Sequence, residues 1–526
     1  MARFRMNRRA ALAGAGALLA QPRLVFGQGG APAVIGSDAV RPRAEWGASA
    51  GDVSADRAII WSRADRTARM QVEWSTSDSF RDARRVMGPH VTEATDFTGK
   101  IDLSGLPPDQ EVFYRVTFQD PTTPGLAAEP VTGRFRTVPV SRRDVKFLWS
   151  GDTVGQGWGI DESRGGMMTY DAMRRTGADF FIHCGDTIYA DSVVAGEIRY
   201  PDGSLSKQLV TPEKAKVAET LAEFRGAHRY NLMDRNVRAF HAEVAQMWMW
   251  DDHEVVNNWS SSKDLSANAA YHEKRIGALR ANATRAFLDY APLRPDPDEA
   301  ERVYRRVSYG PHLDLFMLDM RSYRGPNTHN RQEAAGAETA FLGEAQLRWL
   351  KEGLRASRAT WKVIAADMPI GLQVPDGKDG EGRPLFEAIA NGNGPVLGRE
   401  LEIADLLSAI RANNIRNVVW LTADVHYTAA HHYHPDRAQF RDFAPFWEFV
   451  SGPLWAGGFG PNALDDTFGP EVVWQKAPGM DNAAPADNTQ FFGEVRIAGE
   501  DGAMTVLLRN MAGTSLWERR LTPDRA

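Results

Sequence analysis

Residues 179–189 read DFFIHCGDTIY, an apolar run that ends in a Gly-Asp pair and a tyrosine. The part Asp179–His183 is short and apolar, which predicts a buried β-strand. Val145–Trp149 is a similar run followed by Ser-Gly-Asp, and Ala245–Trp250 is followed by Asp-Asp-His-Glu. Helix-forming residues at Met167–Thr176 separate the first two runs. Strands that alternate with helices predict an α/β sheet, in which ligands bind beyond the carboxyl ends of the strands.

Further strands are expected downstream of these three. Apolar runs recur at Leu313–Leu318, Lys362–Ala366 and Asn417–Leu421. The C-terminal tail alternates between apolar and polar residues, which predicts antiparallel strands that complete a second sheet. These tail strands are expected at Phe492–Ile497, Ala503–Arg509 and Ser515–Leu521. The stretch from 145 to 522 therefore reads as one α/β domain.

An all-β module is expected before this domain, over residues 36–138. Short β-rich runs such as Glu111–Phe118 alternate with turn residues at regular spacing. Gly105-Leu-Pro-Pro followed by Tyr114 is typical of a fibronectin type III strand entry, where a buried tyrosine fixes the corner. We therefore expect a fibronectin III-like β-sandwich that serves as a scaffold.

The first 30 residues read as an export signal. Arg8-Arg9 precedes the small and apolar run Ala10–Ala20, which is too short to span a membrane. The paired arginines resemble a twin-arginine signal, with a Sec signal as the alternative. The expectation is a periplasmic or secreted protein that crosses the twin-arginine translocation machinery already folded. No later stretch has 18 uninterrupted apolar residues, so no transmembrane segment is expected in the mature form.

Composition narrows the class of protein. The chain has 526 residues, 43% hydrophobic and 25% charged, as in ordinary globular proteins. A net charge of −6 argues against a stable nucleic-acid complex. The single cysteine, Cys184, cannot form an intrachain disulfide. Stability must come from a packed core.

Acids follow four of the expected strands. They are Asp152, Asp186, Asp252 and Asp424. A lone Gly-Asp is more often a turn or cap, but four carboxylates at one sheet edge would repel each other without a cation. Oxygen-rich sets with His and Tyr suit Ca²⁺, Mn²⁺, Mg²⁺ or ferric iron. The sequence therefore predicts a metal site.

Three short motifs sharpen this hypothesis. Gly185-Asp186-Thr-Ile-Tyr189 places a carboxylate and a phenol on one loop, and a phenolate is a hard donor that suits ferric iron. Asp251-Asp-His-Glu254 resembles the GNHE turn of calcineurin-type metallophosphoesterases, and Asp424-Val-His426 resembles their GHxH turn. Order along the chain and position after strands agree for all three.

With these motifs the chain resembles the PhoD-like alkaline phosphatase/phosphodiesterase family over nearly all of its expected mature length. The resemblance rests on residues 46–63, 183–189, 250–258, 318–324, 423–426 and 448–453. It implies a four-layer sandwich of two mixed sheets flanked by helices, a ferric-iron and calcium centre, and hydrolysis of phosphate mono- and diesters by a metal-activated hydroxide.

The resemblance also implies metal ligands. Asp186 would bridge two metals, and Asp152, Tyr189 and His426 would complete the first. Some family members carry a cysteine near Asp152, and its absence here leaves Mn²⁺ or Ca²⁺ open beside Fe³⁺. Two or more ions are expected.

The second metal would be held by Asp252 and Asp424. Asp367 stands where relatives place a histidine, so it is either a further ligand or a strand-end cap. An all-oxygen set favours Ca²⁺.

Three residues are candidates for catalysis and substrate binding. His253 would be the general acid that protonates the leaving group, or else a histidine hydrogen-bonded to Glu254. Asn258 would contact phosphate or metal, or simply cap a turn. Arg321 would clamp phosphate, or pair with Asp319.

Other functions stay open. The same site would serve a phospholipase D-like or nucleotidase phosphodiesterase, with a phospholipid or nucleotide as substrate. A non-catalytic surface-binding protein is the alternative from another class. The presence of Asp186, Asp252, His253, Asp424 and His426 together argues against it, since a decayed site should lack at least one.

Overall fold

The computed structural model describes residues 40–123, 125–127, 129–200 and 203–524. The expected export signal, residues 1–30, lies outside the described residues. Residues from Pro42 onward form one compact unit.

A nine-stranded mixed sheet carries the first site strands. Its centre is β8 (Val145–Ser150), β9 (Phe180–His183) and β12 (Ala245–Trp248), which run parallel. The sheet order is β24-β23-β22-β8-β9-β12-β1-β2-β5. Its other strands are β1 (Ala48–Gly51), β2 (Arg57–Arg63), β5 (Thr98–Ser104), β22 (Phe491–Ile497), β23 (Met504–Asn510) and β24 (Ser515–Leu521).

The C-terminal strands form as expected but join a different sheet. β22 pairs antiparallel with β8, from Gly493 against Trp149 to Ile497 against Val145. The tail therefore extends the sheet of β8, and the expectation that it completes a second sheet is wrong. Alternation predicts strands but does not select the edge on which they pair, because any free edge offers the same backbone groups.

A seven-stranded sheet forms the second half. Its parallel strands are β14, β15, β18 and β20, in that spatial order. Strands β13 and β19 run antiparallel to them, and β21 pairs antiparallel with β19 at the edge. The strands are β13 (Arg305–Ser308), β14 (Leu313–Met317), β15 (Trp361–Ala365), β18 (Val418–Thr422), β19 (Thr428–Tyr433), β20 (Phe446–Val450) and β21 (Pro470–Lys476).

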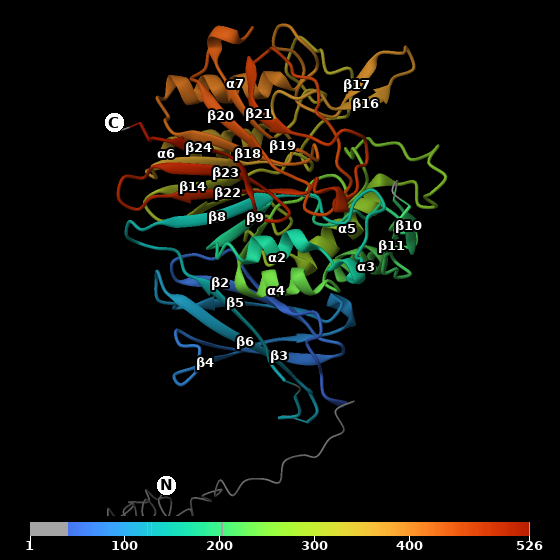
Figure 1. The fold of residues 1–526 in the computed structure, drawn as a ribbon, viewed down its shortest axis with the longest axis vertical. Coiled ribbons are helices and arrows are strands. Elements are labelled where there is room, and N and C mark those ends of the chain that lie inside the picture. Colours follow the sequence, from blue (N-terminus) through green and yellow to red (C-terminus); the bar gives the residue numbers. More distant parts are fainter. Residues whose placement is uncertain (1–39, 124, 128, 201–202, 525–526) are drawn as a thin grey trace, which may run out of the picture. The chain divides into compact units, whose positions relative to one another are not determined.

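The two sheets share one buried core, and helices cover their outer faces. Phe147 and Ile182 of the nine-stranded sheet and Val363 and Leu421 of the other belong to one apolar cluster. Figure 1 shows α2 beside β8 and β9, α4 beside α2, and α7 beside β20. Helices α2 (Met168–Arg174), α4 (Arg235–Glu243) and α5 (Ile276–Tyr290) cover the first sheet, and α6 (Glu344–Ala356) and α7 (Glu400–Ala412) cover the second. Helix α3 (Leu221–Asn231) packs against α5.

The N-terminal strands divide between two sheets. Strands β1, β2 and β5 continue the nine-stranded sheet, because Gly51 of β1 pairs in parallel with Gln246 of β12. A separate sheet of order β4-β3-β6-β7 lies beyond β2 and β5 (Figure 1). Its strands are β3 (Ala68–Ser75), β4 (Arg84–Val91), β6 (Glu111–Gln119) and β7 (Val131–Arg136). Two hairpins complete the structure, β10 (Glu197–Arg199) with β11 (Leu205–Lys207), and β16 (Pro375–Lys378) with β17 (Pro384–Phe386).

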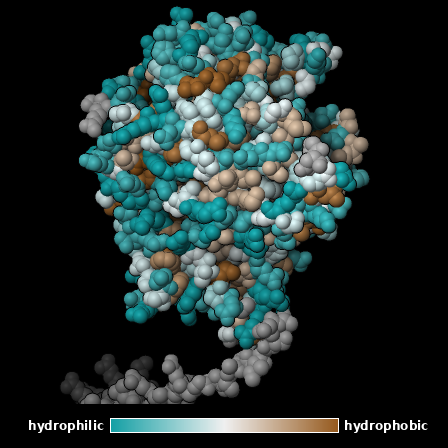
Figure 2. Space-filling model, viewed as in Figure 1, coloured by the Kyte–Doolittle hydropathy of each residue, from teal (hydrophilic) through white to brown (hydrophobic). Residues whose placement is uncertain are grey.

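Hydrophilic side chains dominate the face of the molecule in Figure 2, where hydrophobic ones form small separate patches. Among the described residues, none of the helices has the length and apolar character needed to cross a membrane.

Candidate metal centre

Parallel strands of both sheets end at one place. Asp152 follows β8, Asp186 follows β9, Asp252 follows β12, and Asp424 and His426 follow β18. The carboxyl ends of parallel strands share one edge of a sheet, which explains why acids far apart in the sequence meet.

The turns that carry these residues are strained. Asp152, Asp186, Asp424 and His426 all have left-handed backbone angles, with φ of 68°, 53°, 63° and 61°. Such a conformation costs a residue with a side chain on the order of 1 kcal/mol, and it persists where the surroundings impose it. Gly185 has a φ of 112°, and a Cβ there would lie 2.5 Å from the Cβ of Asp251. Glycine therefore lets the turns after β9 and β12 approach closely.

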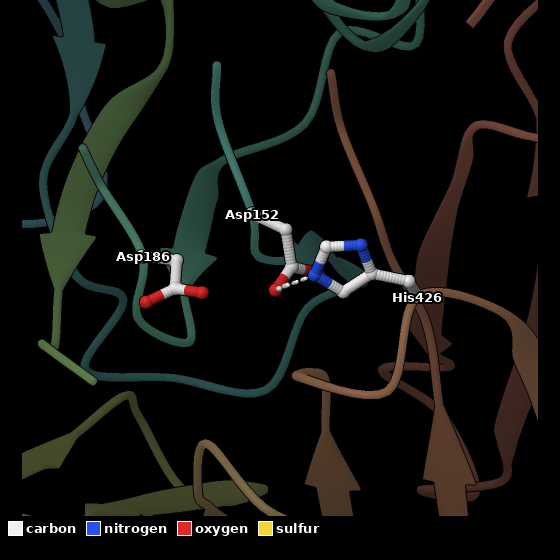
Figure 3. A group of neighbouring side chains, drawn as sticks. All are labelled: Asp152, Asp186 and His426. Atoms are coloured by element: carbon white, nitrogen blue, oxygen red, sulfur yellow. Dashed lines mark ion pairs between the residues drawn. The ribbon is translucent and has the colours of Figure 1, made fainter. Parts of the chain in front are cut away.

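The first group consists of Asp152, Asp186 and His426, whose candidate ligand atoms lie within 4.8 Å of one another. Figure 3 shows the imidazole of His426 pointing at the carboxylate of Asp152, with Nε2 3.5 Å from Oδ1. Nδ1 of His426 bonds the carbonyl of Gly457, so it carries the proton and Nε2 presents its lone pair. Burial lowers the pKa of His426 to about 4. The imidazole is therefore held neutral, as a metal ligand requires.

Tyr189 completes this group. Its hydroxyl lies 2.8 Å from Nε2 of His426. Its ring packs against the ring of His253, with centroids 4.1 Å apart, and a Cβ at Gly155 would lie 2.6 Å from it. Burial, followed by the charges of Asp186 and Asp152, raises the pKa of Tyr189 well above its ordinary value. Only a strongly charged cation beside the oxygen would ionise this phenol.

Two more groups continue from the first. Asp186, Asp252 and His253 form one, and Asp251, Asp252 and Asp424 form the other, each within 4.8 Å. Since Asp186 and Asp252 each belong to two groups, the three groups form one continuous cluster.

The cluster fits cations. Burial raises the pKa of Asp152, Asp186 and Asp424 well above the ordinary value, because desolvated carboxylates disfavour their charged forms. Oδ2 of Asp152 and Oδ1 of Asp252 are buried without a hydrogen-bond partner among the described residues. Buried carboxylates without donors are what hard cations bind.

Arg321 also lies in this cluster. Its side chain has no exposed surface, and it bonds Asp251 and Glu387 through Nε and Nη1. Nη2 has no hydrogen bond within the described chain and lies 3.8 Å from Asp424. Asp319 accepts from the backbone of Arg321, not from its guanidinium. The ion pair with Asp319 is therefore absent.

Asp367 is drawn toward the same arginine. Its Oδ2 lies 3.3 Å from Nε of Arg321, and neither carboxylate oxygen makes a hydrogen bond to a described residue. Asp367 thus faces the cluster from the end of β15, next to a cation that the chain itself supplies.

His253 is held by a carboxylate that the sequence reasoning missed. Its Nδ1 lies 2.7 Å from Oδ1 of Asp191, and its ring is 14% exposed. Burial alone would lower the pKa of His253, but the charges of Asp191, Asp252 and Asp186 raise it well above the ordinary value. Glu254 bonds Thr187 instead of His253. Asp191 therefore orients the imidazole of His253.

Asn258 lies at the edge of the cluster. Its backbone N–H donates to Asp252, and its Nδ2 donates to Asp376 over 2.7 Å. A carboxylate only accepts, so the amide nitrogen must face Asp376. The carbonyl oxygen is left for another partner.

Asp191, Asp251, Asp376 and Glu387 are the site residues that sequence reasoning did not select. Asp191 stands two residues after Tyr189, and Asp251 directly precedes Asp252, so proximity to a motif could have found both. Asp376 and Glu387 come from the β16–β17 hairpin region, and only tertiary structure brings them near.

The sequence matches known families in two places. The family described as PhoD-like phosphatase matches residues 147–508. Its N-terminal domain family matches residues 29–139. The chain is 25% identical over 444 residues to alkaline phosphatase D from Bacillus subtilis (strain 168), covering 80% of this chain and 71% of that protein.

Solved structures show the same fold. The structure titled "Structure of PhoD" superposes with a TM-score of 0.66 at 19% identity, covering 93% of this chain and 90% of that one. Purple acid phosphatase PPD1 from yellow lupin seeds gives a TM-score of 0.55 at 11% identity, covering 92% and 75%.

Proposed function

The chain belongs to the PhoD-like phosphatase family and is a metal-dependent phosphoric ester hydrolase. We propose that it hydrolyses phosphate mono- or diesters at the acid cluster, the group of carboxylates beyond the carboxyl ends of β8, β9, β12 and β18. The observation that carries this is the series of three groups linked through Asp186 and Asp252, with His253 held beside them by Asp191.

In this proposal the first metal is held by Asp152, Asp186, Tyr189 and His426. The second is held by Asp186, Asp252 and Asp424, with Asp367 and Asp251 next to it. The metals supply charge for the phosphoryl oxygens and an activated water. The lone pair that His426 directs at Asp152 supports its role as a ligand.

His253 gives its proton to the leaving oxygen. Asp191 keeps Nδ1 engaged, so Nε2 is the ring nitrogen left to carry the proton to be transferred. The charges of Asp191, Asp252 and Asp186 raise the pKa of His253, which favours its acid form.

Arg321 and Asn258 act beside the phosphate. Only Nη2 of Arg321 lacks a hydrogen bond among the described residues, so a phosphate contact would use that nitrogen. The carbonyl oxygen of Asn258 suits a metal better than a phosphate, because Asp376 holds the amide nitrogen.

We further propose which metals the site binds, how the protein is exported and how the chain divides into domains. Fe³⁺ beside Tyr189 and Ca²⁺ among the carboxylates are favoured, with Mn²⁺ as the alternative. Residues 1–30 serve as a twin-arginine signal that delivers the protein to the periplasm or the medium. Residues 36–138 form a fibronectin III-like scaffold, which is supported by three strands (β1-β2-β5) facing four (β4-β3-β6-β7), and residues 145–522 are catalytic.

The test is turnover of an aryl phosphate monoester and the matching bis-aryl diester by metal-loaded protein. We expect hydrolysis of at least one, abolished by Asp252→Asn. No hydrolysis of either ester by a protein that carries its metals would contradict the proposal. A phospholipid and a nucleotide diester, added as further substrates, separate the phospholipase D-like and nucleotidase alternatives.

A further inference from the structure

A polar cavity lies at the opposite ends of the strands from the acid cluster. Its volume is about 810 Å³, and its walls include Thr360 at the start of β15. Thr360 directly precedes β15 and Asp367 follows it, seven residues later. Seven residues of extended chain span on the order of 20 Å, which is the distance between the cavity and the acid cluster. The cavity is therefore distinct from the candidate metal centre.

Positive charge gathers around this cavity. Five basic side chains line it, against three acidic ones. The basic residues are Arg142, Arg355, Arg358, Lys362 and Arg416, and the acidic ones are Glu500, Asp501 and Asp524. Asp501 is already paired with Arg520, which is not a lining residue, at 3.0 Å. A chain with a net charge of −6 thus concentrates cations here.

Three of these cations lack a carboxylate partner. Within the described part of the chain, no ion pair involves Arg142, Arg355 or Arg358. Guanidinium groups without partners are the groups that recognise phosphate, sulfate and carboxylate oxygens in a bidentate manner.

The negative ends of two helix dipoles offset only part of this positive charge. Helices α6 and α7 both end at the cavity, with Arg355 in the last turn of α6. Basic residues near helix C-termini are common, because each terminus carries about half a negative charge. Two termini sum to roughly one negative unit, which is less than the net positive charge left by five basic and three acidic side chains.

The remaining lining shows what kind of anion fits. The amides of Asn413, Asn414 and Asn417 and the hydroxyl of Thr360 offer hydrogen bonds. No Phe, Tyr or Trp is among the described lining residues, so the cavity offers no surface on which a nucleobase would stack. The volume lies within the range of small-molecule sites, roughly 300–1,000 Å³.

We propose that this cavity binds a free small polyanion that carries two or more phosphate, sulfate or carboxylate groups. Its walls come from parts of the chain far apart in sequence. Arg142 lies in the link between β7 and β8, Glu500 in the turn between β22 and β23, and Asp524 near the C-terminus. A polyanion held by Arg142 and by Arg355 at the end of α6 joins distant parts of the chain and so stabilises the folded state, since it binds the folded chain alone.

The test uses 1,2-ethanedisulfonate on the metal-loaded full chain, because a sulfonate is not a phosphate ester substrate and binds metals weakly. Ethanesulfonate at equal ionic strength is the reference. We expect the disulfonate to raise the melting temperature of the wild type in a saturable way and to leave ester hydrolysis unchanged. Isothermal titration should give one site per chain.

The variant R142Q/R355Q/R358Q should bind the disulfonate at least about tenfold more weakly, because each lost guanidinium removes a charge-assisted bond. The matched variant R69Q/R81Q/R84Q removes the same charge from exposed positions in β3, in β4 and in the turn before β4, and should bind like the wild type. Both should hydrolyse ester at the wild-type rate, which shows that they are folded. R358Q alone replaces the triple variant if the latter does not fold.

Two results would overturn the proposal. One is the absence of a saturable shift in the wild type. The other is an equal loss of binding in the two triple variants, which would mean general electrostatic attraction without a site. Loss of hydrolysis in all proteins would instead count against the proposed function, and disulfonate binding would still be read separately.

Discussion

Of the residues at the site, His253 gives the sharpest test of the chemistry. If it protonates the leaving group, His253→Ala should lower kcat roughly 10²–10⁴-fold on an alkyl phosphate, whose leaving oxygen needs a proton. The loss should be much smaller on a nitrophenyl ester, whose leaving group departs unprotonated. Comparing kcat for both esters in both proteins measures this.

Asp191→Asn is the companion variant, because it keeps the shape but removes the charge that holds Nδ1 of His253. It should show a weaker version of the same leaving-group dependence, with metal content unchanged. Equal losses on both esters would assign His253 to metal orientation.

Tyr189 allows a test of the first metal by colour. A tyrosinate bound to ferric iron gives a visible charge-transfer band, whereas Ca²⁺ or Mn²⁺ gives little. Tyr189→Phe should abolish the band and lower activity, while the circular dichroism spectrum stays that of the wild type. A colourless and fully active wild-type protein would exclude iron at this position and favour Ca²⁺ or Mn²⁺.

At the element scale, the strands that carry the acids could be predicted from the sequence, because short apolar runs before Gly-Asp or Asp-Asp are a strong local signal. Asp152, Asp186 and Asp424 follow strands as expected. Pairing partners could not be predicted in the same way. Gly51 of β1 pairs with Gln246, almost 200 residues later, and the C-terminal strands choose β8. Such contacts depend on which edges remain free after the rest has packed.

The partners of site residues were missed for the same reason. Glu387, which bonds Arg321, follows the β16–β17 hairpin, and nothing local marks it. Arg321 likewise pairs through tertiary structure. Its sequence neighbour Asp319 does not bind the guanidinium, and five acids from elsewhere surround it: Asp251, Asp252, Asp367, Glu387 and Asp424.

Helix α7 begins with a buried acid, Glu400, that should make stability depend on pH. Burial, followed by the charge of Asp465, raises its pKa to about 8. In the folded state it keeps its proton up to that pH, whereas the unfolded chain loses it near 4.5. Its contribution to stability is therefore present at low pH and is lost as pH rises from about 5 through 8.

Glu400→Gln keeps the neutral form and should remove this loss. The free energy of unfolding of the variant minus that of the wild type should rise by up to about 1.4 kcal/mol per pH unit over that range. Above about pH 8 this difference should stay constant. Urea unfolding from pH 5 to 9 measures it, with exposed Glu344→Gln as the control. Parallel curves for Glu400→Gln and wild type would show that the acid is ionised in the fold.

At the scale of the whole molecule, one buried core joins the two sheets and extends into the N-terminal strands, where Met70 and Val72 belong to the same cluster as Phe147. The acid cluster is assembled from strands of both sheets, so metals bound there connect the two halves of the catalytic domain. Removing them should lower stability as well as activity, since bound ions stabilise only the folded state.

The most direct measurement is metal content and ester hydrolysis on the same samples of wild type and Asp186→Asn, because Asp186 belongs to two of the three groups. Elemental analysis should find two or more ions per wild-type chain, and prolonged chelation should remove them together with activity and lower the melting temperature. Asp186→Asn should lose ions and turnover in parallel. A wild-type protein that is free of metal yet fully active would contradict the account.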